Sequence, residues 1–283
     1  MRLSYFPGCS LDGTAKEYGL STSAACQRLG LELIEVPDWN CCGASSGHST
    51  SYLLGHALAA RNLILAERQG LDLVVACAAC FSRFKKTAIA LRDNTGLNKK
   101  MGEIMGTPYE GKFEIKHLLD VICNTVGLES IRKKVTNPLK DLRLVPYYGC
   151  VIVRPHELTQ FDDEEQPQSM DNLMEAIGAE CLPWSGKIDC CGASLSLTRV
   201  DIVKELAREI VEMAKEAGGQ AIVTACPLCQ ANLDMRYGKD GLPIFYFTEL
   251  LGLALGIDGQ VWLDRHMTDP FPLLTSLNLA KGE

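Results

Sequence analysis

The stretch Cys41-Cys42-Gly43-Ala44-Ser45 occurs twice in this chain, and its second copy is Cys190-Cys191-Gly192-Ala193-Ser194. In both copies thirty-four residues separate the double cysteine from a Cys-x-x-Cys pair, and a single cysteine precedes it by thirty-one or thirty-nine residues. Ten of the thirteen cysteines therefore form two matched sets of five. The first quintet is Cys9, Cys41, Cys42, Cys77 and Cys80, and the second quintet is Cys150, Cys190, Cys191, Cys226 and Cys229.

Strands and helices alternate around these cysteines. Short apolar runs predict strands at 2–6, 31–36, 71–76, 142–147, 180–182 and 221–225. Amphipathic stretches predict helices at 15–29, 49–69, 171–177 and 200–216, and a similar helix closes each half at Leu118-Leu119 and Leu250-Leu251. Strands separated by helices indicate an α/β fold with small parallel sheets that have helices on both faces.

The order of motifs is the same in both halves, which predicts an internal duplication. We place the boundary near 135–140 and expect two homologous domains, 1–137 and 138–283, related by a pseudo-twofold axis. Each is long enough to bury its own core. The first half carries extra residues at 94–112, expected to be a connection and a surface helix, and the second has a longer loop near 154–169.

Composition excludes several classes of protein. The net charge is -7 and the chain has no long basic run, so nucleic acid is not an expected ligand. The first residues lack the apolar core of a signal peptide, and no apolar stretch is long enough to span a bilayer. We expect a cytoplasmic protein without a membrane partner. In that reducing compartment clustered cysteines are more often metal ligands than disulfides.

The cysteines lie where predicted strands end. The carboxyl ends of parallel strands meet at one edge of a sheet, so Cys9, Cys77, Cys150 and Cys226 can converge there with their quintets. Each Cys-x-x-Cys pair is also expected to open a helix, with Pro227 at the first helical position, where proline is favoured. The free N–H groups of a helix start favour thiolate over thiol. Each quintet therefore predicts a metal site.

The number of thiols points to the kind of metal. A structural zinc ion takes four ligands, and an ordinary cubane iron–sulfur cluster also takes four cysteines. Five cysteines, two of them adjacent, suggest an iron–sulfur cluster in which one thiolate bridges irons or adds to one iron. A zinc ion beside a spare cysteine remains the alternative. Cys26, Cys123 and Cys181 fall outside both quintets, and we expect Cys26 and Cys181 to be small buried core residues.

The doubled pattern of a single Cys, Cys-Cys-Gly and Cys-x-x-Cys resembles the CCG cysteine-rich domain family, and in particular the duplicated chains typified by the B subunit of heterodisulfide reductase from methanogens. The resemblance implies that each quintet holds a non-cubane 4Fe-4S cluster through all five cysteines. It also implies that the pair of clusters reduces the mixed disulfide of coenzyme M and coenzyme B. Disulfide reduction takes two electrons, so each cluster could deliver one of them and hold one sulfur.

The electrons must come from another protein. The chain has no Gly-x-Gly-x-x-Gly motif for a flavin or nicotinamide and no ferredoxin-type cysteine run. The resemblance implies two partners, a ferredoxin-like C subunit, and behind it a flavin-bearing A subunit, with a hydrogenase or formate dehydrogenase upstream.

Arg154 and His156, in the longer loop of the second half, are candidates to bind an anionic group of the substrate, and Lys187 is a third. Two other functions stay open. One is an iron–sulfur component of a different oxidoreductase, of the sulfur-oxidising, lactate, glycolate or fumarate type. The other is a zinc-stabilised module without catalysis.

Overall fold

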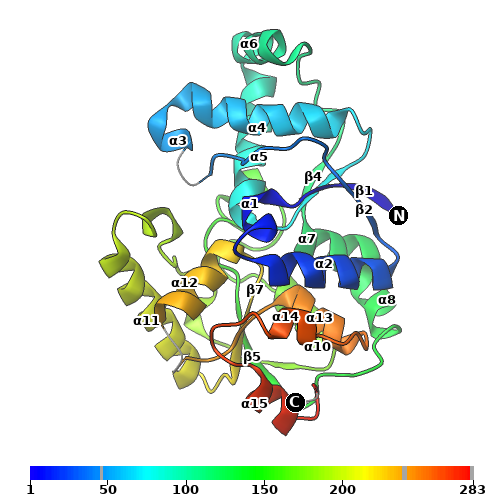
Figure 1. Ribbon diagram of the computed structural model, residues 1–283, viewed down its shortest axis with the longest axis vertical. Coiled ribbons are helices and arrows are strands. Elements are labelled where there is room, and N and C mark those ends of the chain that lie inside the picture. Colours follow the sequence, from blue (N-terminus) through cyan, green and yellow to red (C-terminus); the bar gives the residue numbers. More distant parts are fainter. Residues whose placement is uncertain (45–46, 238–240, 281–283) are drawn as a thin grey trace.

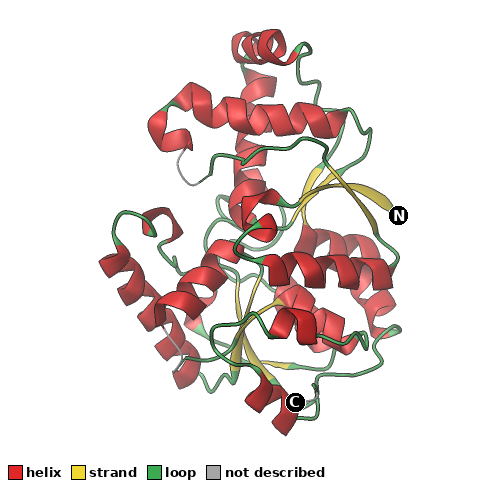
Figure 2. Cartoon of the chain, in the orientation of Figure 1, coloured by secondary structure: helices red, strands yellow, loops and turns green. Residues whose placement is uncertain are grey.

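The computed structural model describes residues 1–44, 47–237 and 241–280. They form two four-stranded sheets in which every pair of neighbouring strands is parallel (Figures 1 and 2). The first sheet has the order β2-β1-β3-β4 and the second the order β6-β5-β7-β8, so the topology is the same in both. The predicted α/β class and the duplication are therefore confirmed. The strands are β1 (Arg2–Phe6), β2 (Glu32–Glu35), β3 (Leu73–Val75), β4 (Ile115–His117), β5 (Arg143–Tyr147), β6 (Glu180–Cys181), β7 (Ala221–Thr224) and β8 (Ile244–Tyr246).

The fourth strand of each sheet was missed by the sequence prediction. β4 and β8 have three residues each and run straight into a helix, so neither leaves a periodic pattern long enough to read. The six predicted strands are all present, with ends that differ by up to two residues.

The helices surround both sheets. In the first half they are α1 (Gly8–Asp12), α2 (Lys16–Leu29), α3 (Gly47–Thr50), α4 (Tyr52–Glu67), α5 (Ala78–Asp93), α6 (Thr95–Met105), α7 (Leu118–Asp120), the π-helical turn η1 (Val121–Gly127) and α8 (Leu128–Arg132). In the second they are α9 (His156–Thr159), α10 (Ser169–Ala176), the 3-10 turns η2 (Ser185–Ile188) and η3 (Ala193–Leu195), α11 (Val200–Glu216), α12 (Pro227–Tyr237), α13 (Phe247–Ala254), α14 (Gln260–Leu263) and α15 (Phe271–Ser276). Among these described helices none has both the length and the apolar character needed to cross a bilayer.

The apolar residues of the stretch 49–69 predict an inward side that includes Leu54, Ile64 and Leu65, and this prediction was partly wrong. Ile64 and Leu65 are buried, but Leu54 is 41% exposed. Much of this helix is apolar around its whole circumference, so periodicity alone did not select the buried side. The surface helix expected within 94–112 is α6, whose first turn is capped by the Asn94 side chain, which accepts a hydrogen bond from Leu97 N at 2.9 Å.

Helices of the two halves pack against each other across their interface. α13, which follows the last strand of the second half, packs on α2 of the first half, where Ser21 and Thr248 share a hydroxyl hydrogen bond of 2.7 Å (Figure 1). Reciprocally, η1 and α8 pack on α10, and the Cys123 thiol donates to Ser169 O at 3.3 Å. One continuous apolar core therefore includes residues from both halves.

A group of buried charges beside α13 makes stability depend on pH. His266 Nε2 lies 3.0 Å from Glu249 Oε1, and neither side chain is exposed. Burial lowers the pKa of His266, but the carboxylates of Glu249, Asp234 and Glu17 outweigh it, so the pKa lies above its usual value. Burial and the charge of Glu249 likewise raise the pKa of Glu17, although His266 and Arg265 oppose this.

Both groups hold their protons more tightly in the folded chain than in the unfolded chain. The folded state therefore binds more protons, and we expect the free energy of unfolding to fall as pH rises from about 5 to about 8. Denaturant titrations across this range test the expectation. The double variant Glu17→Gln/His266→Gln should show a flatter profile, and an unchanged slope would contradict the assignment.

Candidate metal centres

Each quintet gathers at the carboxyl edge of its sheet. Cys9 lies in α1 directly after β1, and Cys77 follows β3 and caps α5. In the second half Cys150 follows β5, and Cys226 lies between β7 and α12, whose first residue is Pro227. The predicted placement of Cys-x-x-Cys at helix starts is therefore confirmed.

Within each quintet the thiols form linked pairs. In the first, Cys9 Sγ lies 3.7 Å from Cys41 Sγ, and Cys42 Sγ lies 3.1 Å from Cys80 Sγ. The thiols of Cys42 and Cys77 both raise the pKa of Cys80, so Cys77 is a neighbour of this pair. Among the described residues no three or more His, Cys, Asp or Glu side chains enclose a single position for a metal ion. The sulfurs instead approach one another in pairs.

The second quintet has a similar arrangement. Cys191 Sγ lies 3.5 Å from Cys229 Sγ, as Cys42 Sγ lies 3.1 Å from Cys80 Sγ in the first quintet. The Cys150 thiol lowers the pKa of Cys190, and the Cys229 thiol lowers that of Cys226, so these pairs are neighbours as well.

The two quintets meet at the interface between the halves. The Cys77 and Cys226 thiols each contribute to the pKa shift of the other, so these two cysteines are neighbours across the junction. The residues before these two cysteines are also bound together, because the buried Tyr18 hydroxyl donates to Ala76 O at 3.0 Å and to Ala225 O at 3.3 Å. The Tyr18 ring stacks on Tyr246 with the ring centroids 4.1 Å apart.

His117 strengthens the same junction. Its Nδ1 accepts a hydrogen bond from Leu119 N, so its Nε2 carries the proton and donates to Ala76 O at 2.9 Å. Burial lowers the pKa of His117 to about 4, so the ring is neutral. Tyr18 and His117 therefore fix the backbone that sets the spacing of Cys77 and Cys226. Neither residue carried a motif that could have revealed this role from sequence.

Access to the thiols differs within each quintet. Cys9 and Cys190 are exposed and Cys41 and Cys150 are partly exposed, whereas the other six cysteines are buried. Hydrogen bonds from neighbouring thiols lower the pKa of Cys41 and of Cys190. Each quintet therefore has one open end at the surface and one closed end at the junction.

Four glycines shape these turns, and all have positive φ. Gly43 and Gly192 follow the double cysteines at φ 76° and 75°, a backbone conformation that favours glycine. A Cβ at either position would crowd a leucine of the next long helix. Gly8 and Gly149 lie close to sulfur, since a Cβ there would lie 3.4 Å from Cys80 Sγ and 3.0 Å from Cys229 Sγ. The repeated Gly-Cys pair was the signal that the sequence offered for this.

Replacing Gly149 by alanine should remove metal from the second centre. The new Cβ would crowd Cys229 Sγ, and the positive φ of 69° would cost about 1–2 kcal/mol of stability. Metal analysis and denaturant unfolding measure the two effects. Gly70→Ala is the matched control, because Gly70 has φ 65° and nothing within 4 Å of its Cβ position. It should lose stability and keep its metal, and equal metal loss in both variants would contradict the steric explanation.

Two of the three candidate substrate residues have side-chain partners within the chain. Arg154 pairs with Glu165 and donates from Nε to Glu164 O at 3.0 Å. The backbone N–H of His156 donates to Glu164 Oε2 at 3.2 Å. Lys187 is buried, with Nζ 2.6 Å from Asp171 Oδ1 and 3.1 Å from Pro167 O. The ammonium of Lys187 thus serves as an internal ion-pair partner.

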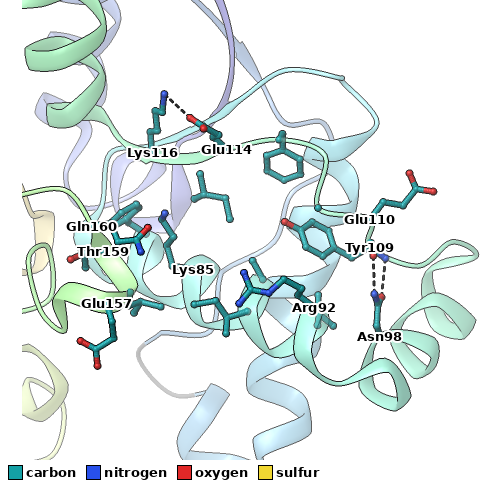
Figure 3. A pocket seen from close by; sticks show the side chains of 18 of the residues that line it. Lys85, Arg92, Asn98, Tyr109, Glu110, Glu114, Lys116, Glu157, Thr159 and Gln160 are labelled. Atoms are coloured by element: carbon teal, nitrogen blue, oxygen red, sulfur yellow. Dashed lines mark hydrogen bonds and ion pairs between the residues drawn. The ribbon is translucent and has the colours of Figure 1, made fainter.

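One cavity lies beside the centres, not over them. It has a volume of about 740 Å³ and runs along α5 toward residues 157–160 of the second half (Figure 3). Lys85 reaches into it, and Lys116 and Glu114 form an ion pair at its edge. Its wall includes Phe81, the buried neighbour of Cys80, but none of the ten cysteines lines it.

Two parallel sheets of identical topology, each presenting five thiols at its carboxyl edge, define a duplicated cysteine-rich α/β protein. The chain belongs to the cysteine-rich (CCG) domain family, whose model matches residues 3–85 and 144–234. Both matches begin near the first strand of a half and end beyond its Cys-x-x-Cys pair.

Relatives of nearly the same length include components of two different oxidoreductases. The chain is 30% identical to the 8-methylmenaquinol:fumarate reductase membrane anchor subunit of Wolinella succinogenes, over 94% of this chain and 96% of that relative. It is also 30% identical to the B subunit of the ferredoxin:CoB-CoM heterodisulfide reductase of Methanosarcina mazei, over 98% of this chain and 97% of that relative.

A solved structure supports the fold alone. A hypothetical protein from Helicobacter pylori matches with a TM-score of 0.73 at 14% identity, and the match covers 95% of this chain and 52% of that longer one.

The residues present fit an iron–sulfur group. The donors of each centre are sulfur only, a set that favours iron–sulfur clusters or zinc over hard cations. Cys77 and Cys226 lie at helix starts, where backbone N–H groups stabilise negative charge. The clustered cysteines are thus consistent with iron–sulfur binding.

Proposed function

We propose that this chain is the disulfide-reducing subunit of a larger oxidoreductase complex and that its substrate is the heterodisulfide of coenzyme M and coenzyme B. The observation that supports the proposal is the junction at which Tyr18 binds the residues before Cys77 and Cys226, whose thiols shift each other's pKa, so that two equivalent thiol centres are neighbours. Reducing a disulfide consumes two electrons and two protons, breaks one S–S bond and releases two thiols. A paired centre matches that requirement.

The proposed cofactors are two non-cubane 4Fe-4S clusters, one per quintet, which when bound supply electrons one at a time. Cys9, Cys41, Cys42, Cys77 and Cys80 would hold the first, and Cys150, Cys190, Cys191, Cys226 and Cys229 the second. The six buried cysteines exclude water from the closed ends. The exposed ends at Cys9 and Cys190 leave room for a substrate sulfur to approach.

Substrate anchoring would fall to the loop that follows Cys150. Arg154 and His156 lie in this loop and could bind an anionic group of the substrate, provided that Arg154 releases Glu165. Lys187 would have to leave its buried ion pair with Asp171 to do so, and we therefore assign it a structural role.

The chain would receive electrons from partner proteins. We propose a ferredoxin-like C subunit, together with a flavin-bearing A subunit, fed by a hydrogenase or a formate dehydrogenase in the cytoplasm. The heterodisulfide reductase relative from Methanosarcina mazei, which matches this chain over nearly its whole length, supports the proposal.

A second candidate function is electron transfer within a quinol:fumarate reductase. The equal identity to the Wolinella succinogenes relative favours it as strongly as the Methanosarcina mazei relative favours disulfide reduction. In that case the chain would pass electrons between partners and would reduce no disulfide itself.

The test uses anaerobically purified chain, with a reduced viologen dye as electron donor. We expect release of thiols from the heterodisulfide, faster than from symmetrical disulfides of coenzyme M or coenzyme B. A protein with full iron that releases no thiol from any disulfide would contradict the proposal and favour the quinol:fumarate reductase function. Stoichiometric zinc without iron would favour a structural module.

A further inference from the structure

We propose that Asn232 raises the reduction potential of the second centre through a hydrogen bond to Cys191, and so biases electrons toward that centre. This inference rests on the proposed iron–sulfur function. It concerns a positioning residue, since Asn232 would act on the cluster only through a ligand.

The Asn232 side chain is held in one orientation. It lies on α12 three residues after Cys229 and is 3% exposed. Its Nδ2 donates to Cys191 O at 2.9 Å, and its Oδ1 accepts from the Ser196 hydroxyl at 3.0 Å. Because a backbone carbonyl can only accept, the nitrogen must face Cys191.

The second N–H of the same amide faces sulfur. Asn232 Nδ2 lies 3.7 Å from Cys191 Sγ, within the range of an N–H···S hydrogen bond. The Ser196 turn that supports this orientation is itself held, because Arg236 Nη2 donates to Ser196 O at 3.3 Å. The donor is therefore placed by contacts on both ends of the amide.

The first quintet differs at this point. The residue three positions after Cys80 is Arg83, and no hydrogen bond between it and a cysteine is found among the described residues. Cys42, the counterpart of Cys191, bonds to the thiols of Cys41 and Cys80 and to its own turn at Ala44. In the described part of the chain only the second quintet has a side-chain amide that donates to sulfur.

The effect on redox chemistry follows from charge. Reduction adds one negative charge that is spread partly over the ligand sulfurs, and an N–H donor stabilises the reduced state more than the oxidised state. The bond is buried, so its electrostatic effect is strong. Removing it should make the second centre harder to reduce.

The experiment is a redox titration of the anaerobic protein, followed by electron paramagnetic resonance. In Asn232→Ala one midpoint potential should move to a more negative value and the other should stay. The shift should persist in a Cys41→Ser/Cys42→Ser background, where only the second centre remains. It should be absent from a Cys190→Ser/Cys191→Ser background.

Asn62→Ala is the matched control. Asn62 is a fully buried amide, but its Nδ2 donates to Asn40 O at 2.8 Å and Leu58 O at 3.2 Å, and not to sulfur. Its removal should leave the potential of the second centre unchanged. If Asn232→Ala loses iron, Ser196→Ala provides the same test with a smaller negative shift expected, because it only loosens the amide.

The outcomes separate the two proposals. Unshifted potentials in Asn232→Ala with iron retained, or in Ser196→Ala if the first variant loses iron, would overturn this inference and leave the proposed function standing. A negative shift of the second centre's midpoint potential in Asn62→Ala, equal in size to that in Asn232→Ala, would also overturn it. Absence of any iron–sulfur signal from the wild-type chain would overturn the proposed function itself.

Discussion

Replacing either double cysteine by serine will remove about half of the bound iron and abolish disulfide reduction. The variants are Cys41→Ser/Cys42→Ser and Cys190→Ser/Cys191→Ser. Each double cysteine links the open end of its quintet to the closed end, because its first thiol pairs with the single cysteine and its second with the Cys-x-x-Cys pair. Losing both removes the two thiols that connect the single cysteine to the Cys-x-x-Cys pair. With one centre gone, the protein cannot supply two electrons together.

Iron analysis and thiol release measure the two losses. Cys181→Ser is the matched control, since Cys181 lies outside both quintets and donates weakly to Asp171 O at 3.6 Å. It should keep full iron and full activity. Activity that survives in either double-cysteine variant would show that a single centre suffices and would refute the paired mechanism.

Replacing Lys187 by methionine should lower the free energy of unfolding by about 3–5 kcal/mol, because it leaves the Asp171 carboxylate buried without its cation. The side chains of Lys187 and Asp171 are 8% and 9% exposed, so water cannot replace the lost partner well. Asp171 Oδ2 also accepts from the Tyr148 hydroxyl at 2.6 Å, which ties the pair to the segment before Cys150.

Denaturant unfolding of Lys187→Met measures the loss. The double variant Lys187→Met/Asp171→Leu should be less destabilised than the single one, because it removes both charges. If Lys187 anchored substrate instead, Lys187→Met would raise KM for the disulfide and leave stability unchanged. That result would restore the binding role first inferred for it from the sequence.

The sequence predicted where the cysteines lie relative to the strands and helices. Parallel strands place their carboxyl ends at one edge, and Cys9, Cys77, Cys150 and Cys226 each follow the end of a strand in the structure. Burial of Cys26 was also confirmed, whereas Cys181 is only partly buried. These features depend on local pattern and composition.

What the sequence could not predict depends on contacts between distant segments. Lys187 precedes a cysteine pair, and nothing in its neighbourhood shows that Asp171 meets it inside the protein. The role of Tyr18 arises only when the two halves meet, because its hydroxyl binds one carbonyl group of each half. Asn232 looks like an ordinary helix residue until its amide is placed beside Cys191.

The packing of α13 on α2, and of η1 on α10 of the other half, bears on the evolutionary origin of the chain. Every residue of α13 is buried, and much of its cover comes from α2 of the other half. An isolated half would expose this apolar helix surface to water at a large cost in free energy. An ancestor with a single domain would thus have needed a second copy of itself to bury this helix. Gene duplication and fusion would then have joined the two subunits of such a homodimer into one chain.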